Sequence, residues 1–254
     1  MLDACEAASK FESEGKKRPV DTKTRHSLKQ DRFAKATASS MNWVSGHRSG
    51  VVRWVVVAVV VVAAVAAGLI YLDWSSGKAN ETLGAALDTY NAPLAQPGAP
   101  AEGGVYTTAG DRAKAANQQF VAVARQYGWL AEGAKAHYFA GVTYEELGNS
   151  ASAETELKTA AGAWDRNLAN LAKLALAGLY HQGNRDAEAI ALYNALAAKP
   201  SETVPAAVAQ LDLADLYAEQ GKTEQARKLW AAVKDADKDG AAGSIATQKL
   251  GGKQ

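Results

Sequence analysis

The chain has 254 residues, a formal net charge of +1 and one cysteine, Cys5, which excludes an internal disulfide and a metal site built on a cysteine pair. The basic part of the chain is short and lacks interleaved aromatics, and the larger part is acidic, so we expect no nucleic-acid interface. Abundant alanine and only 7% aromatic residues favour an all-α protein made of packed helices.

The N-terminal part of the chain is basic. Residues 1–53 contain 11 Lys/Arg and 6 Asp/Glu. Residues 1–22 have the polar composition of a disordered segment. Residues 23–53 form a basic segment that we expect in the cytoplasm. Two interpretations of residues 23–44 stay open: a short amphipathic helix on the inner leaflet, or a solvated basic flank of a membrane anchor.

An apolar run follows at residues 54–72, with 19 uncharged residues. As a helix it would be about 28 Å long, close to the thickness of the hydrocarbon layer. Trp54 begins it, and Tyr71 and Trp74 stand at its other end, as aromatic residues do at membrane interfaces. The run therefore predicts one transmembrane helix. A buried helix of a soluble protein and a cleaved signal peptide are the alternatives.

Charge asymmetry predicts the orientation of this helix. Seven Lys/Arg residues lie between residues 23 and 53, whereas Lys78 is the only one between residues 73 and 111. Because cytoplasmic flanks carry the excess of basic residues, we expect the N-terminus in the cytoplasm. The larger part, residues 73–254, is then expected on the far side of the membrane.

An internal repeat dominates the domain expected at residues 76–254. Three segments align without gaps from Ala134, Asn170 and Ala207, with offsets of 36 and 37 residues. Each has a small residue, a tyrosine three positions later, a small residue nine further on and a bulky residue four beyond that. The equivalent residues are Gly141, Ala177 and Ala214; Tyr144, Tyr180 and Tyr217; Ala153, Ala189 and Ala226; and Leu157, Tyr193 and Trp230.

This spacing predicts stacked helical hairpins, because one such hairpin cannot bury its apolar stripe alone. The repeats are expected at residues 134–167, 170–204 and 207–239, with a capping helix at 241–250. Gly148 and Gly221 fall at two of the turns, where a left-handed residue ends the first helix. In the middle repeat Gly183 sits one place early, so Asn184 takes the turn position.

A divergent repeat is expected before these three, at residues 79–127. Its first helix would cover residues 79–90, with Gly84 as the small residue, and its second residues 111–127, with Ala116 and Phe120 in the small and bulky positions. A loop insertion at residues 91–110, rich in proline and glycine, separates them. The loop is either a partner-binding element or a tolerated surface insertion.

The small-x-x-Tyr-x-x-x-Gly pattern, followed by Ala and a bulky residue, resembles the tetratricopeptide repeat family. That resemblance implies a right-handed solenoid whose first helices line a groove for protein partners. The groove positions are Lys135, Tyr138, Val142, Glu145, Leu174, Gly178, His181, Leu211, Asp215 and Ala218. They lack the Lys/Asn clamp by which some members hold a C-terminal carboxylate. A mixed apolar and acidic groove suits an extended or unfolded polypeptide, or a partner helix.

Candidate chemistry is sparse, so we expect no enzyme, cofactor or metal. None of the four histidines has a metal-ligand spacing with another ligand residue. Adjacent Glu145 and Glu146 are expected to point in different directions on one helix. The run from Asp235 to Gly240 matches the first half of a calcium loop, but its twelfth position is Ala246. A polar, helix-terminating run explains the same residues.

The order of basic segment, anchor and repeats resembles the bacterial ancillary SecYEG translocon subunit family, over residues 23–250. The stretch Arg25 to Asp31 contributes to this resemblance. It implies a single-pass inner-membrane protein with a periplasmic domain, acting as a scaffold or chaperone-like factor near the secretion channel. Translocon subunits, periplasmic chaperones and unfolded clients are the implied partners. The alternative is a scaffold for cell division or for outer-membrane or envelope assembly.

Overall fold

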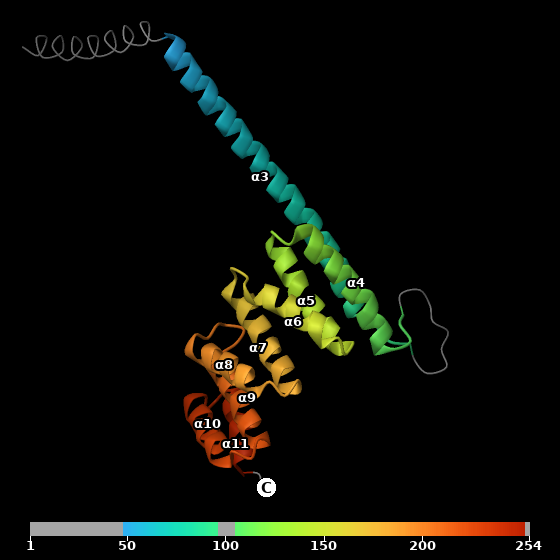
Figure 1. Ribbon diagram of the computed structural model, residues 1–254, viewed down its shortest axis with the longest axis vertical. Helices are drawn as coiled ribbons and strands as arrows, with labels where there is room; N and C mark the ends of the chain where they lie inside the picture. The colour runs from blue at the N-terminus through green and yellow to red at the C-terminus, as the bar shows by residue number, and fades with distance from the viewer. Residues whose placement is uncertain (1–47, 96–104, 252–254) are drawn as a thin grey trace, which may run out of the picture. The chain divides into compact units, whose positions relative to one another are not determined.

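The computed structural model describes residues 48–95 and 105–251 (Figure 1). The interpretations of residues 1–22 and 23–44, and the centre of the predicted loop, lie outside these residues. The chain divides into two units between Leu69 and Ile70, which are described separately. All regular elements in the described ranges are α-helices, apart from one isolated bridge, so the all-α prediction is confirmed.

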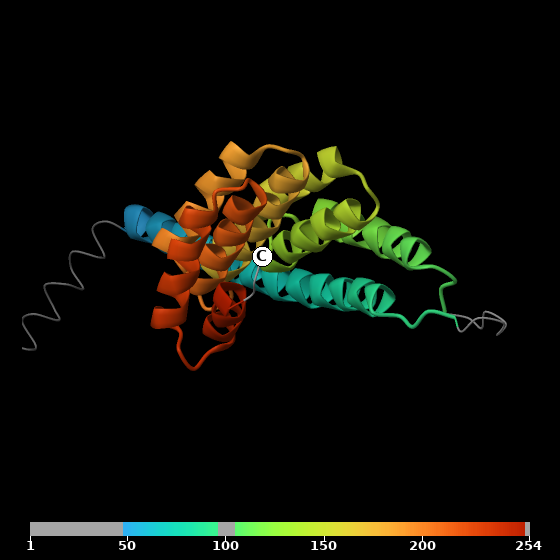
Figure 2. The same cartoon turned by 90° about the horizontal axis from the view of Figure 1, so that it is seen from below.

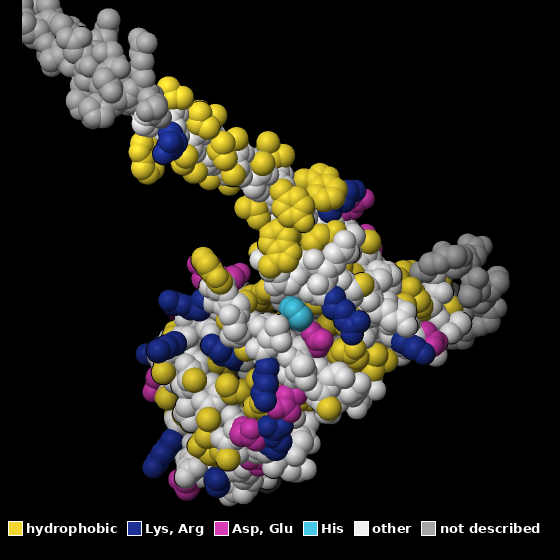
Figure 3. All heavy atoms as spheres, turned by 45° about the horizontal axis from the view of Figure 1, so that its top comes forward, with side chains coloured by type: hydrophobic (Ala, Val, Ile, Leu, Met, Phe, Trp, Pro, Cys, Tyr) yellow, Lys and Arg dark blue, Asp and Glu magenta, His cyan; other side chains and the backbone are white. Residues whose placement is uncertain are grey.

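The apolar run belongs to α3, Arg48–Tyr90. Its apolar side chains between Val52 and Leu69 are exposed (Figure 3). Within residues 48–95 and 105–251, α3 is the one helix long and apolar enough to cross a membrane, although a signal sequence would pass the same test. The predicted helices at 54–72 and 79–90 are one continuous helix, because the residues between them contain no proline to interrupt it.

The second unit contains the end of α3 and eight further helices among its described residues. They pack in sequence, each against the next from α4 to α11, as expected for a helical-repeat array (Figures 1 and 2). Their bounds are α4 Ala109–Tyr127, α5 Ala131–Glu146, α6 Ser150–Ala161, α7 Arg166–Gln182, α8 Asp186–Ala198, α9 Ala206–Glu219, α10 Thr223–Ala236 and α11 Ala241–Gly251.

The two ends of the predicted loop lie close together. Leu94 and Tyr106 form the isolated bridge, and the N–H of Ala95 donates to the carbonyl of Tyr106 at 2.8 Å. Arg112, in the first turns of α4, donates to the carbonyl of Ala92 at 3.2 Å. The inserted segment therefore leaves and returns at one place beside α4, so its length does not disturb the packing of the helices.

The hairpin turns agree with the sequence in detail. Gly148 and Gly221 both have φ of 73°, and Asn184 has φ of 58°. Gly183, by contrast, has no positive φ and ends α7 as its C-cap. The prediction that Asn184, rather than the neighbouring glycine, takes the left-handed position is confirmed. Asparagine tolerates this conformation better than most residues with a side chain.

The repeated bulky residues fill the core between hairpins. Leu157, Tyr193 and Trp230 are at most 6% exposed. Leu157 and Tyr193 share a buried cluster with Tyr180, while Trp230 belongs to the next cluster along the array. Burial of such side chains against neighbouring hairpins is the main source of stability expected for a repeat array.

The divergent repeat follows the prediction in its second helix but not at Gly84. Ala116 and Phe120 of α4 are fully buried. A Cβ atom on Gly84 would meet nothing within 4 Å, so this glycine does not mark a close helix contact. Leu83 and Ala86 of α3 are buried in the cluster with Phe120 instead. The contacting stripe of α3 therefore passes beside Gly84.

Candidate partner-binding face

The first helices of the hairpins, α5, α7 and α9, are linked by side chains: Gln182 bonds to Glu145, and His181 lies 2.8 Å from Glu219. Backbone contacts also connect α5 with α7, and α9 with α11, while no comparable set connects α7 with α9, α6 with α8 or α8 with α10 among the described residues. Arrays of stacked hairpins curve and offer extended concave surfaces for binding. The face formed by α5, α7 and α9, which we call the first-helix face, is therefore the candidate site.

The ten predicted groove residues are not equally accessible. One is exposed, eight are half-buried and one is buried. The exposed residue is Lys135 and the buried one is Leu211. The half-buried residues are Tyr138, Val142, Glu145, Leu174, Gly178, His181, Asp215 and Ala218.

Leu211 differs from the expectation, because it belongs to the core. Its side chain is 8% exposed and packs in a cluster with Ala214 and Trp230. Leu174 and Tyr138 also touch buried clusters, while keeping part of their surface open. The repeat pattern could not separate residues that keep part of their surface open from those turned toward the next helix.

Gly178 of α7 borders open space. No heavy atom lies within 4 Å of the position that its Cβ would occupy. Gly141, at the contact between α5 and α6, is the opposite case, since a Cβ there would lie 2.6 Å from Cγ of Leu157. Gly141 therefore serves helix packing, whereas a side chain at position 178 would meet no other part of the described chain within 4 Å.

Polar residues of the face are connected from one hairpin to the next. Gln182 of α7 donates to the carboxylate of Glu145 of α5 at 2.7 Å. Lys249 of α11 donates to Asp215 of α9 at 2.8 Å, and Trp230 donates to the same carboxylate. Glu145 and Asp215, which the sequence predicted as partner contacts, therefore bind side chains of other helices within the chain.

His181 makes the corresponding link between α7 and α9. Its Nδ1 lies 2.8 Å from Asp186, and its Nε2 lies 2.8 Å from Glu219. Gln220 also donates to Asp186 at 2.5 Å. The hydrogen bond to Asp186, with that to Glu219, raises the pKa of His181 against the opposing effect of burial. A positive imidazolium between two carboxylates strengthens this junction.

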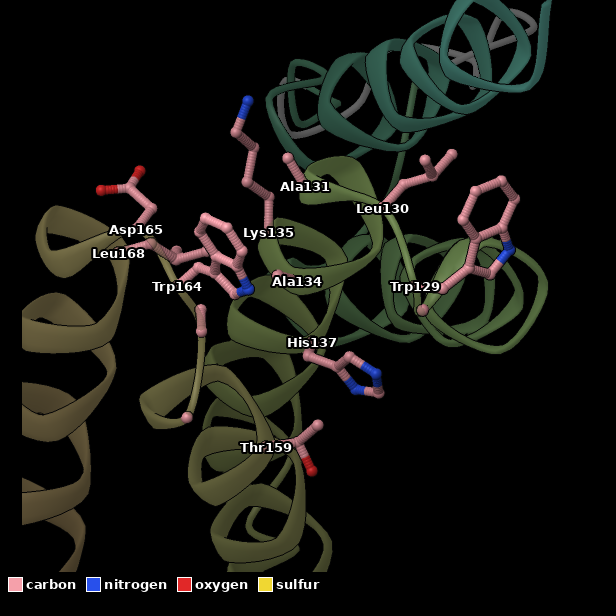
Figure 4. A pocket seen from close by; sticks show the side chains of 13 residues that line it. Trp129, Leu130, Ala131, Ala134, Lys135, His137, Thr159, Trp164, Asp165 and Leu168 are labelled. Atoms are coloured by element: carbon pink, nitrogen blue, oxygen red, sulfur yellow. The ribbon is translucent and has the colours of Figure 1, made fainter. Parts of the chain in front are cut away.

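A concave feature lies at the α4–α5 and α6–α7 connections. It is an open cavity of about 620 Å³ (Figure 4). Trp129 and Trp164 lie on opposite sides of the first turns of α5, with Lys135 near Trp164. Trp164 is 98% exposed and Trp129 is 55% exposed. Such large exposed aromatic surfaces are typical of interaction sites.

The local sequence holds each tryptophan in place. Asp165 caps α7 by accepting the N–H of Asn167 at 2.8 Å, so Trp164 stands directly before a fixed helix start. Trp129 stacks on Tyr71, with ring centroids 6.2 Å apart and planes 3° from parallel. Sequence reasoning missed both residues. The repeat alignment contained a signal, since the positions equivalent to Trp164 hold Pro200 and Asp237, ordinary turn residues.

The partial calcium motif is part of a helix terminus. Asp237 ends α10 and accepts the N–H of Gly243 in the first turn of α11 at 3.1 Å. A Cβ on Gly240 would collide with the carboxylate of Asp237, so a larger residue there would require that carboxylate to move. Across residues 48–95 and 105–251, no three of the His, Cys, Asp and Glu side chains are grouped as metal ligands would be. The helix-terminating interpretation explains these residues.

No protein-family model matches the chain, and the search of curated proteins found no matching sequence. What is established is therefore an all-helical chain of sequentially packed helix pairs with one long apolar N-terminal helix.

Proposed function

We propose that the protein is a membrane-anchored adaptor that binds polypeptides on its first-helix face. The observation that carries the proposal is the open space at Gly178, one helical turn along α7 from the half-buried apolar side chain of Leu174. Open apolar positions on neighbouring helices accommodate side chains of an extended segment or of a helix. The polar links around them keep the hairpins in fixed positions, which lowers the entropy cost of binding.

We further propose that the three hairpins are tetratricopeptide repeats and that α3 is retained as a membrane span. The constant repeat offsets and the left-handed turn residues support the first part. The long basic segment before the apolar run supports the second, because a signal peptide has a short basic region. The excess of Lys/Arg before the run favours a cytoplasmic N-terminus and a domain on the far side, in the periplasm of a bacterial cell.

The finer proposal is a scaffold or chaperone-like role beside the secretion translocon. It depends on the resemblance at Arg25 to Asp31 and on the order of anchor and repeats. A domain held close to the far side of a channel would meet polypeptides as they emerge, and a mixed apolar and acidic face suits unfolded chains. This assignment makes the protein a binding partner and not an enzyme.

Site-specific photo-crosslinking of the full-length chain in its native membrane tests the proposal. A photoreactive amino acid is placed at Val142, Leu174 or Gly178 on the first-helix face. Matched probes at Thr155, Asn194 and Lys228 occupy exposed positions on α6, α8 and α10. We expect adducts from the first set and few from the second, because the partner contacts the first helices.

The identities of the adducts distinguish the finer alternatives. Channel subunits, periplasmic chaperones or secreted polypeptides support the translocon role. Cell-division or envelope-assembly proteins, without channel subunits, would replace it with the alternative scaffold role. Equal labelling from both probe sets would contradict binding on the first-helix face. Turnover of a cell-wall substrate by the purified full chain would contradict the assignment as a non-enzyme.

A further inference from the structure

The exposed aromatic residues of the second unit form a group beyond the partner-binding face. Tyr71, Trp74 and Trp129 are 58%, 62% and 55% exposed. Tyr71 lies between the other two rings, with centroids 6.3 Å from Trp74 and 6.2 Å from Trp129. The intramolecular contacts therefore cover only part of each ring. We call these three residues the aromatic cluster.

The sequence indicates where this cluster lies. Tyr71 is the penultimate residue of the apolar run, and Trp74 follows the first charge after it, Asp73. If α3 spans a membrane, both rings are at the level of the lipid headgroups, where tyrosine and tryptophan are enriched. Trp129 comes from the α4–α5 connection, and its stacking on Tyr71 brings that connection to the same level.

The cavity extends this surface beyond the cluster. Its lining joins Trp129 and Leu130 of the α4–α5 connection to Trp164 and Leu168 of the α6–α7 connection (Figure 4). Lys135 and Asp165 are the charged side chains of the lining, so their charges offset each other. A surface with large aromatic groups and little net charge suits the boundary between headgroups and acyl chains better than an electrostatic partner.

We propose that Trp129 and Trp164 insert into the headgroup layer of the bilayer and, with Tyr71 and Trp74, hold the repeat domain against the membrane. The occupant is the lipid surface itself, reached through side chains continuous with the end of the span. This contact would limit how the first-helix face turns relative to the membrane. The inference rests on the proposed retention of α3 as a membrane span.

Lipid-depth quenching on the full-length chain in phosphatidylcholine–phosphatidylglycerol vesicles tests this inference. Cys5 is replaced by Ser, and single cysteines at 129 and 164 carry an environment-sensitive fluorophore. Cysteine at Leu147, an apolar residue 37% exposed at the α5–α6 turn, is the matched control. We expect blue-shifted emission at 129 and 164, and stronger quenching by a nitroxide near the glycerol backbone than by one deep in the acyl chains.

The control at 147 should keep aqueous emission, and added salt should leave the quenching at 129 and 164 unchanged. Quenching at 129 and 164 no greater than at 147 would overturn the inference. A blue shift at 129 and 164 that depends on protein concentration would also overturn it, because it would indicate contact with a second copy of the chain. A label at Val60 separates the two proposals. Deep quenching at Val60 without quenching at 129 and 164 would contradict the insertion of the tryptophans but agree with α3 as a membrane span. No quenching at Val60 would contradict the membrane span itself.

Discussion

Gly141 of α5 lies so close to Leu157 of α6 that no side chain fits between them: a Cβ on the glycine would lie 2.6 Å from Cγ and 2.8 Å from Cδ2 of the leucine. Leu157 is fully buried and cannot move into solvent. This contact between α5 and α6 therefore depends on the absence of one methyl group.

Replacing Gly141 with alanine should destabilise the repeat domain. Overpacking of a buried contact lowers the free energy of unfolding by about 1–3 kcal/mol, and the better helix propensity of alanine offsets about 1 kcal/mol of this loss. The measurement is denaturant unfolding of the full chain in detergent, followed by helical circular dichroism. Gly178→Ala is the matched control, since its Cβ meets nothing within 4 Å, and it should be neutral or stabilising. Equal effects of both changes would contradict the close contact.

The turn at Asn184 gives a second prediction. A β-branched residue in the left-handed region is strained, so Asn184→Val should lower the free energy of unfolding by about 1–2 kcal/mol. Asn184→Gly should change it little, because glycine adopts this conformation without strain. Thermal unfolding of the two variants provides the comparison. A valine variant as stable as the glycine variant would show that the turn is not left-handed.

The left-handed turn at Asn184 could be predicted from the sequence, whereas the hydrogen bonds between hairpins could not. The left-handed conformation could be assigned to Asn184 because the repeat alignment makes it equivalent to Gly148 and Gly221, and local sterics decide its conformation. The bond between Glu145 and Gln182 could not, since it depends on the angle between hairpins and on side-chain rotamers.

Non-local packing also explains the other differences. The buried position of Leu211 follows from the neighbouring helices α10 and α11 and not from its place in the repeat. The stacking of Trp129 on Tyr71 joins residues 58 positions apart and needs the arrangement of α3, α4 and α5. Periodicity carries information about one hairpin, and these contacts arise between elements.

A third prediction concerns Arg185, which connects the first two repeats. Its guanidinium donates to Glu154 of α6 at 2.6 Å and to Glu188 of α8 at 2.6 Å, and lies 4.1 Å from the ring centroid of Tyr180. The bonds from Arg185 and Lys158 lower the pKa of Glu154 to about 2. The stability from this carboxylate is complete above its ordinary pKa near 4.5 and is lost as the pH falls toward 2.

A double-mutant cycle with Arg185→Gln and Glu154→Gln measures this link. We expect a coupling energy of about 0.5–1 kcal/mol at neutral pH, typical of a partly exposed ion pair with good geometry. The coupling should disappear as the pH approaches 2. A coupling unchanged in acid would mean that the charge of Glu154 does not contribute.

His181 gives the opposite pH dependence. Because its pKa is raised in the folded state, its contribution is complete below the ordinary value of 6.5 and is lost as the pH rises through the raised value. The melting temperature should therefore fall as the pH increases from below 6.5 into the alkaline range. In His181→Gln, which keeps a hydrogen-bonding side chain, that fall should be smaller. An identical profile for the variant would exclude His181 as its source.

Filling the gap at Gly178 tests the first-helix face directly. Gly178→Phe adds an aromatic ring where no atom of the chain lies within 4 Å of the Cβ position, so folding should be retained. The ring would occupy the space proposed for a partner side chain, and adducts from photoreactive probes at Val142 and Leu174 should be lost. Asn194→Phe places the same ring on the exposed surface of α8 and should leave those adducts unchanged. Undiminished crosslinking in the Gly178 variant would show that partners do not enter this gap, because a polypeptide that used it could not share the space with a phenyl ring.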